Sequence, residues 1–294
     1  MKIPQSSKAP NWLQKLRFTN KPLEYLDHAI EQNLDLFHAP IINNNTTLLL
    51  VSHPQAIQQI FVNEAQEFSA PGNSYLSPLV GDYSLFCLGG LPHQRQRKLL
   101  LPTFHGDRIN VYAKLIQELT QKNLQKIPRC SKFMARNLMQ NISLDIILKA
   151  IFGLNQGEKF DYLKKLLITL MDLFESPLTS SAMFFTFLQK EWFGLTPWHR
   201  FLKVKQEIHH FIKKEIQQRR QESVTNRQDI LSLLLSARDE EGKPMTDEEL
   251  QDQLISLLLA GQETTASVMA WGLYWIHHHP EIKEKLQQEL ATLG

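Results

Sequence analysis

The chain contains 294 residues, of which 43% are hydrophobic and 21% are charged. These fractions are close to those of folded globular domains and exclude disordered and collagen-like proteins. Because 32 basic residues are balanced by 30 acidic ones, no overall charge draws the protein to nucleic acid or to a membrane surface. The two cysteines are too few for a disulfide framework, and residues 1–10 lack the apolar core of a signal sequence. We therefore expect a cytoplasmic protein without a transmembrane segment.

The first part of the chain predicts helices and a small sheet. Pro22 suits a helix start, and apolar residues recur with helical spacing as far as Phe37. The aliphatic segment 46–51 and the asparagine-rich turn before it favour a hairpin between residues 41–42 and 48–51. A further helix is expected from His53 to Asn63. Residues 69–92 are rich in proline and glycine, which predicts a long loop of a kind that is often functional.

After Pro92 nearly every segment has the apolar period of a helix. No repeat, low-complexity tract or flexible linker marks a domain boundary. We therefore expect one mainly α domain with a small early β-sheet. Residues 176–197 form an aromatic-rich connector that either covers the core or lines an apolar entrance. The predicted helices are His93–Leu101, Arg108–Gln125, Phe133–Phe152, Phe160–Phe174, Trp198–Gln221, Asp229–Ala237 and Leu250–Ile276.

The last and longest of these helices contains residues that helix stability alone would not select. A glycine inside a helix costs about 1 kcal/mol relative to alanine, yet Gly261 lies at its middle. Ala260, Gly261 and Thr264 are three or four residues apart, which predicts a shallow notch with a hydroxyl at its edge. Glu263 adds an ionisable group that needs a partner or a raised pKa. An acid beside a hydroxyl suggests proton delivery to a flat ligand; alternatively, the small residues only let another helix cross closely.

A second motif follows Gly89-Gly90 on a short basic helix. His93 and Arg97 are four residues apart and share one face, where they form a two-point donor for an anion. The planar guanidinium of Arg97 suits a carboxylate. For Arg95 and Lys98 an exposed surface without a ligand is favoured.

These two motifs, in this order, resemble those of the cytochrome P-450 haem-thiolate monooxygenases. The C helix of that family carries Trp or His, then Arg four residues later, then Pro-x-Phe; here these are His93, Arg97 and the segment Pro102–Phe104. The I helix of the family carries Ala/Gly-Gly-x-Asp/Glu-Thr-Thr, which matches residues 260–265. The resemblance runs from about Leu23 to the end and is strongest to soluble bacterial members.

The resemblance implies a haem-dependent monooxygenase that hydroxylates a lipophilic small molecule with O2 and receives electrons from a ferredoxin or flavodoxin. His93 and Arg97 would bind the haem propionates, and Ala260 and Gly261 would let the macrocycle approach the helix. Glu263 and Thr264 would be the catalytic residues, with roles in oxygen activation and proton delivery.

The axial cysteine of the family lies in a glycine-rich loop well beyond the I helix. Neither Cys87 nor Cys130 lies in such a motif, so no metal ligand is assigned in this chain. We expect residues 1–294 to form a single incomplete P-450 domain that ends just after the I helix, exposes one face of that helix and is inactive alone. Two alternatives stay open: a non-catalytic helical ligand-binding module, and a helical interaction protein in which both motifs serve packing.

Overall fold

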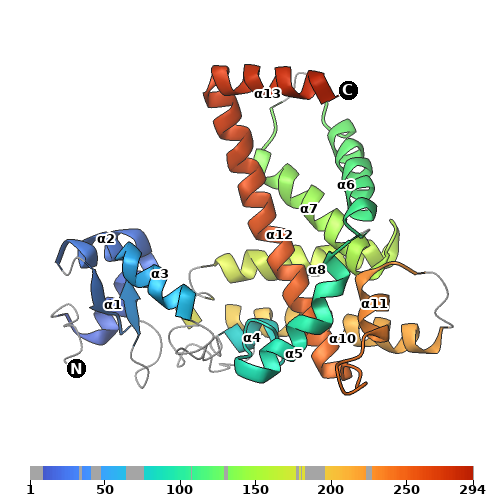
Figure 1. Ribbon diagram of the computed structural model, residues 1–294, viewed down its shortest axis with the longest axis horizontal. Helices are drawn as coiled ribbons and strands as arrows, with labels where there is room; N and C mark the ends of the chain where they lie inside the picture. Colours follow the sequence, from blue (N-terminus) through green and yellow to red (C-terminus); the bar gives the residue numbers. More distant parts are fainter. Residues whose placement is uncertain are drawn as a thin grey trace. The chain divides into compact units, whose positions relative to one another are not determined.

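The computed structural model describes residues 9–32, 35–40, 48–63, 76–106, 108–128, 132–176, 179, 181–182, 196–222 and 227–293 (Figure 1). The described part is mainly helical with one two-stranded sheet, as the sequence predicts. The chain divides into two compact units, the first made of residues 1–82, 86–93 and 165–210, the second of residues 83–85, 94–164 and 211–294.

The first unit contains the small sheet. Strands β1 (Leu36–His38) and β2 (Leu49–Val51) are antiparallel, with Phe37 opposite Leu50. Phe37 and Ala39 are fully buried and form a small core. The helices near this sheet and in the adjoining chain are α1 (Asn11–Asn20), α2 (Pro22–Gln32), α3 (Pro54–Asn63) and α4 (Ser77–Val80).

One prediction for this region is wrong in detail, and one helix was not predicted. Helix α2 ends at Gln32 rather than Phe37, because Phe37 gains more from burial in the sheet than from another turn of helix. The first strand therefore precedes the predicted residues 41–42, which lie outside the described part. Helix α1 was not predicted, because its polar residues rather than its apolar ones are buried. Gln14 and Lys15 are buried, whereas Trp12 is 63% exposed.

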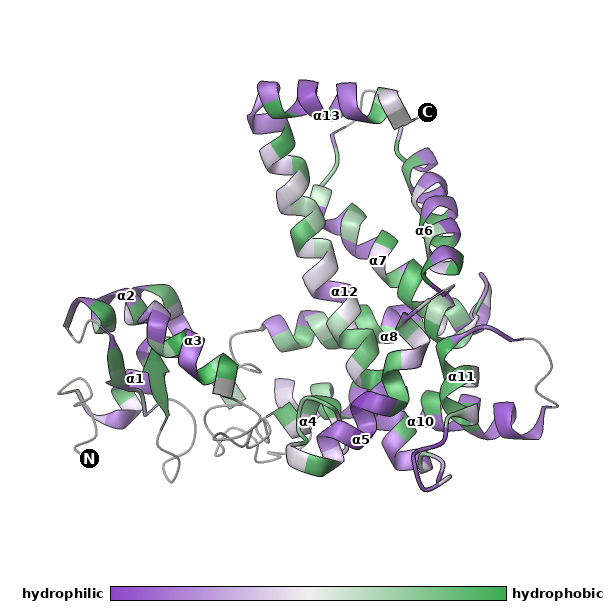
Figure 2. Cartoon of the chain, viewed as in Figure 1, coloured by the Kyte–Doolittle hydropathy of each residue, from purple (hydrophilic) through white to green (hydrophobic). Residues whose placement is uncertain are grey.

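The predicted helices after Pro92 are confirmed, with ends that differ by a few residues. Figure 2 shows hydrophilic and hydrophobic residues alternating along α6, the pattern of a helix with one face in water. The helices of this region are α5 (Gly90–Leu100), the 3-10 helix η2 (Leu101–Phe104), α6 (Arg108–Gln125), α7 (Ala135–Phe152), α8 (Glu158–Glu175), α10 (Pro197–Gln221), α11 (Ile230–Ser236), α12 (Asp247–His278) and α13 (Pro280–Leu293).

Helix α12 has a well-defined start. The Thr246 hydroxyl accepts a hydrogen bond from the Glu249 N–H, and the Glu249 side chain accepts one from the Thr246 N–H. This arrangement is a capping box, and it satisfies two N–H groups that the helix itself leaves unpaired. Three acidic residues, Asp247 to Glu249, also place negative charge at the positive end of the helix dipole.

Helix α7 lies beside α12 (Figure 1), and the two make the most extensive helix–helix contact of the described chain. Ala266 of α12 is fully buried against Met139 and Ile142 of α7. Helix α7 ends at Gly153, whose φ of 65° is left-handed and favours glycine. A side chain there would also come within 3.2 Å of Asp229.

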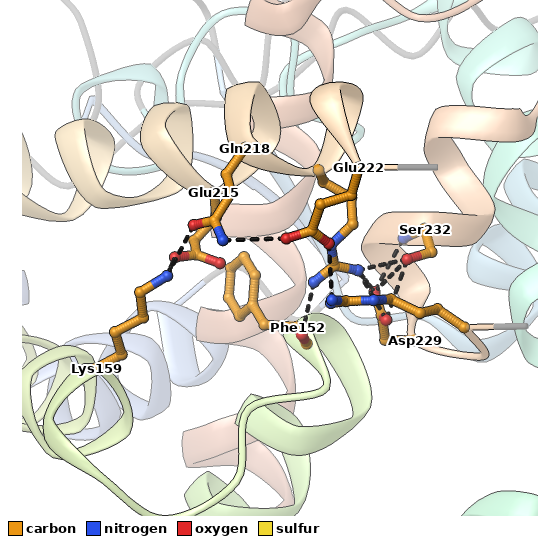
Figure 3. Close-up of polar contacts among 9 residues, drawn as sticks. Phe152, Lys159, Glu215, Gln218, Glu222, Asp229 and Ser232 are labelled. Carbon is orange, nitrogen blue, oxygen red and sulfur yellow. Dashed lines mark hydrogen bonds and ion pairs between the residues drawn. The ribbon is translucent and has the colours of Figure 1, made fainter. Parts of the chain in front are cut away.

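A buried ion pair joins α7, α10 and the start of α11 (Figure 3). The Arg219 guanidinium donates to both oxygens of Asp229 at 2.7 and 2.8 Å and to the Phe152 carbonyl at 3.0 Å. Asp229 in turn caps α11 by accepting from the Ser232 N–H. Because Arg219 is only 3% exposed, each of its contacts offsets a large loss of hydration.

Candidate functional site

The cationic side chains of the basic helix α5 fall into two groups, those with an acidic partner among the described residues and those without one. Arg95 donates to Asp239 at 2.7 Å and to Glu249 at 2.7 Å, and Lys98 pairs with Glu240 at 2.6 Å. In contrast, Arg97 makes no hydrogen bond or ion pair through its side chain within the described part of the chain.

Arg95 is therefore a structural residue of the second unit. Its hydrogen bond with Asp239 raises the pKa of the guanidinium and lowers the pKa of the Asp239 carboxyl. The contact with Glu249 also ties α5 to the first turn of α12. This agrees with the interpretation that Arg95 holds no ligand.

The side chains of His93 and Arg97 lie four residues apart on α5, as predicted. His93 is half-buried and Arg97 is exposed. Like Arg97, His93 has no side-chain partner among the residues that the structure describes. Two donors without an internal partner on one helix are suited to an anionic group such as a carboxylate.

The 260–265 motif lies on α12, where α7 packs against one side of the helix. Ala266, Met269 and Ala270 pack against α7, whereas Thr264, Val268 and Trp271 are exposed. The exposed positions recur every three or four residues and form one face of α12 directed away from α7. Thr264 lies at the beginning of this face.

Gly261 is in close contact with α7. A Cβ atom at this position would lie 2.1 Å from the Cδ1 atom of Ile147, and the Ser143 hydroxyl donates to the Gly261 carbonyl at 2.7 Å. The sequence grouped Gly261 with Thr264 in one notch, but the structure gives this glycine a packing role that the alternative interpretation foresaw. Contact of Gly261 with a cofactor stays a prediction.

The side chains of Thr264 and Glu263 make different hydrogen bonds. The Thr264 hydroxyl donates to the Ala260 carbonyl at 2.5 Å, a common local bond for a threonine within a helix. Glu263 accepts hydrogen bonds from Arg136 at 2.7 Å and from Gln140 at 2.9 Å. Burial would raise the pKa of Glu263, but these hydrogen bonds outweigh it and lower the pKa below its usual value. The partner that the sequence requires for this acid is therefore on α7.

The middle of the predicted 69–92 loop is fixed to α12. The Tyr83 N–H donates to Asp252 at 2.9 Å, and the Gln253 amide donates to the Tyr83 carbonyl at 2.6 Å. The Ser84 and Ser256 hydroxyls lie 2.7 Å apart. Polar residues on the buried face of α12 thus serve as partners for loop backbone, and they position this loop two helical turns before the motif.

Two cavities in the described part of the chain lie apart from the two motifs. One of about 500 Å³ is lined by residues of α1 and α2, including Arg17 and Tyr25. Another of about 570 Å³ lies beside α6 and includes Tyr112 and Arg227. Neither contains a residue of the two motifs, so Thr264 belongs to an open helix face rather than to either cavity.

Sequence reasoning missed Arg136, Gln140 and Ser143. They are four and three residues apart on α7, and this polar stripe on a largely apolar helix is the signal that could have drawn attention to them. Of the two cysteines, Cys87 is half-buried, and Cys130 lies outside the described part. No group of three or more His, Cys, Asp or Glu residues able to hold a metal ion occurs among the described residues.

A sequence model of the cytochrome P450 family matches residues 20–293, nearly the whole chain. The chain belongs to the cytochrome P450 family. It is 29% identical to cytochrome P450 135A1 of Mycobacterium tuberculosis over 286 residues, which cover 97% of this chain and 62% of that protein. It is likewise 29% identical to cytochrome P450 138 of Mycobacterium bovis over 297 residues, which cover 100% of this chain and 65% of that protein.

The fold agrees with this assignment to the P450 family. A retinoic acid-bound cyanobacterial CYP120A1 superposes with a TM-score of 0.81 at 21% identity, over 99% of this chain and 63% of that one. This P450 chain thus spans somewhat less than two thirds of the length of these relatives. None of its described helices combines the length and apolar character needed to cross a bilayer.

Proposed function

We propose that the protein takes part in haem-dependent monooxygenase chemistry, the hydroxylation of a lipophilic small molecule with O2. Membership of the P450 family supports this reaction type. We infer a lipophilic substrate from the apolar character of the 69–92 loop and the 176–197 connector. A ferredoxin or flavodoxin would supply the electrons, and both compact units would belong to one P450 domain.

The main support for the proposal is the side chain of Arg97. Its neighbours Arg95 and Lys98 are neutralised by Asp239, Glu249 and Glu240, yet Arg97 has no acidic partner in the described part of the chain. With His93 it would bind the two propionates of haem. This donor set fits the cofactor because both groups are cationic or can become so and are otherwise unpaired.

The haem would supply the oxygen-activating chemistry, and the residues of α12 would orient reactants and move protons. Ala260 and Thr264 would line the open face beside the reacting centre. The Thr264 hydroxyl, which donates to the Ala260 carbonyl, would instead donate a hydrogen bond toward the reacting centre. Glu263 would transfer protons between water and this hydroxyl.

Titration of the purified chain with haem tests the role of Arg97. Loss of a charge-assisted hydrogen bond of about 1.5–3 kcal/mol predicts that Arg97→Ala weakens haem affinity by roughly 10- to 100-fold. Lys98→Ala is the matched control and should leave haem affinity unchanged. It removes an exposed cation from the same helix, but Lys98 is already paired with Glu240.

A second probe separates propionate binding from a general effect of charge. Haem whose two propionates are methyl esters cannot form the ion pair, so wild type and Arg97→Ala should bind the diester equally. Equal binding of unmodified haem by wild type and Arg97→Ala would contradict the proposal.

A further inference from the structure

Helices α1 and α2 pack against each other in the first unit (Figure 1), and with the strand residue Phe37 they line a cavity of about 500 Å³. Cavities of roughly 300–1,000 Å³ are of the size that takes small organic ligands. The described residues that line this cavity all belong to the first unit, and none belongs to the two motifs. A ligand held there would therefore be additional to the haem and the substrate of the proposed function.

The less exposed part of the cavity lining is apolar. Ala29 and Phe37 belong to the small core beside the sheet. The Tyr25 ring also lines the cavity, and its hydroxyl donates to the Gln14 amide oxygen at 3.1 Å. The Gln14 amide nitrogen donates in turn to the Ala9 carbonyl at 2.7 Å. Because these polar groups bond within the protein, this part of the lining needs no polar ligand atom and suits a hydrocarbon chain.

The Tyr25 ring is held in place without a ligand. It contacts the Phe18 ring edge to face, with the ring centroids 5.8 Å apart, and its hydroxyl is fixed by Gln14. Burial raises the pKa of Tyr25, so the hydroxyl stays protonated at neutral pH and remains a donor to Gln14. A lining that is already ordered loses little conformational freedom when a ligand binds.

Among the described residues, the exposed rim of the cavity carries one positive charge without a counter-charge. Lys21 donates to both carboxylate oxygens of Glu24 at 2.7 and 3.0 Å, so these two rim charges neutralise each other. The remaining basic groups of the rim are His28, which lies 3.8 Å from Glu31, and Arg17. The Arg17 guanidinium makes no hydrogen bond or ion pair with any residue that the structure describes. The charge available to a ligand is thus that of Arg17.

We propose that this cavity binds a fatty acid or a similar carboxylate amphiphile, with the carboxylate paired to Arg17 and the hydrocarbon chain against Ala29 and Phe37. The planar guanidinium can donate two parallel hydrogen bonds to one carboxylate. Arg17 would repel a cation, and an uncharged lipid would leave it unpaired. A single guanidinium also matches the single charge of a carboxylate better than the nearly double charge of a phosphate monoester.

Dodecanoate is the probe for this site. Its binding to the purified chain without haem can be measured by isothermal titration calorimetry, and one molecule should bind per chain. Arg17→Gln should weaken the binding roughly tenfold, the lower end of the effect of a charge-assisted hydrogen bond, because Arg17 is exposed. Dodecanol has the same hydrocarbon chain without the charge, so wild type and Arg17→Gln should bind it equally.

A second pair of variants locates the ligand in the cavity. Leu16 lines the cavity and is 42% exposed, whereas Leu23 is 74% exposed and is not among the described residues that line it. Leu16→Glu places a negative charge beside the bound carboxylate and should weaken dodecanoate binding, because like charges repel. Leu23→Glu is the matched control and should leave the binding unchanged. Both leucines are exposed, so both variants should fold.

Arg97→Gln separates this site from the haem site. It should leave dodecanoate affinity unchanged, and Arg17→Gln should leave haem affinity unchanged, so failure of this inference and failure of the proposed function give different results. Unchanged dodecanoate affinity in either Arg17→Gln or Leu16→Glu would overturn the inference. Absence of binding at millimolar dodecanoate would do the same. If Leu16→Glu does not fold, Arg17→Gln decides alone.

Discussion

Replacement of Gly261 by alanine tests how closely α7 and α12 approach. The added methyl group would lie 2.1 Å from Ile147 Cδ1, so one of the two side chains must move. Overpacking of this kind costs about 1–3 kcal/mol. The lower part of that range applies, because Cδ1 is the free end of a half-buried side chain. Alanine also stabilises a helix interior by about 1 kcal/mol relative to glycine, so the net effect should be a loss of about 0–1 kcal/mol.

Gly272 provides a matched control on the same helix. A Cβ atom there would meet no other atom within 4 Å, so Gly272→Ala should stabilise the protein by the full helix preference of about 1 kcal/mol. Urea unfolding followed by circular dichroism should therefore place Gly261→Ala about 1–2 kcal/mol below Gly272→Ala, with similar denaturant slopes.

Ile147→Val locates the cause of this difference. The substitution removes Cδ1 and by itself should cost about 0.5–1.5 kcal/mol. In the Gly261→Ala background it should cost less than in the wild type, because it relieves the overlap. Equal stabilisation by Gly261→Ala and Gly272→Ala, without coupling to Ile147, would refute the packing role of Gly261.

Three further predictions follow from buried and terminal polar groups. Arg219→Leu should lower the free energy of unfolding by about 3–5 kcal/mol, because it leaves the Asp229 charge buried without its partner. Arg220→Leu breaks an exposed ion pair and should lower it by about 1 kcal/mol or less. Similar losses for the two variants in urea unfolding would contradict this prediction. Burial lowers the pKa of His209 from 6.5 to about 4, so the unfolded state binds more protons and stability should fall as pH drops from 6.5 toward 4. His209→Gln should flatten this dependence in unfolding curves at pH 7.5 and pH 5, and an unchanged slope would count against it. Thr246→Ala should cost about 1 kcal/mol by removing the α12 cap, and no change in thermal unfolding would show that the cap is dispensable.

Local sequence signals located the helices well because their causes are local. Thr246 and Glu249 lie within four residues of each other, so the start of α12 could be predicted without knowledge of the fold. The His93 and Arg97 spacing likewise follows from helical geometry alone. Phe37 was misassigned because its burial depends on Leu50 across the sheet, a contact that helical periodicity does not reveal.

The sequence by itself determined the mainly helical class, the cap of α12, the two motifs and the need of Glu263 for a partner. Tertiary structure decided which partner that is. Arg136 and Gln140 lie more than 120 positions from Glu263, and their contact depends on how α7 packs against α12. The same packing places Ile147 against Gly261 and leaves Thr264 on the open face. Residue spacing defines the faces of one helix, but the packing of a second helix decides which face is covered.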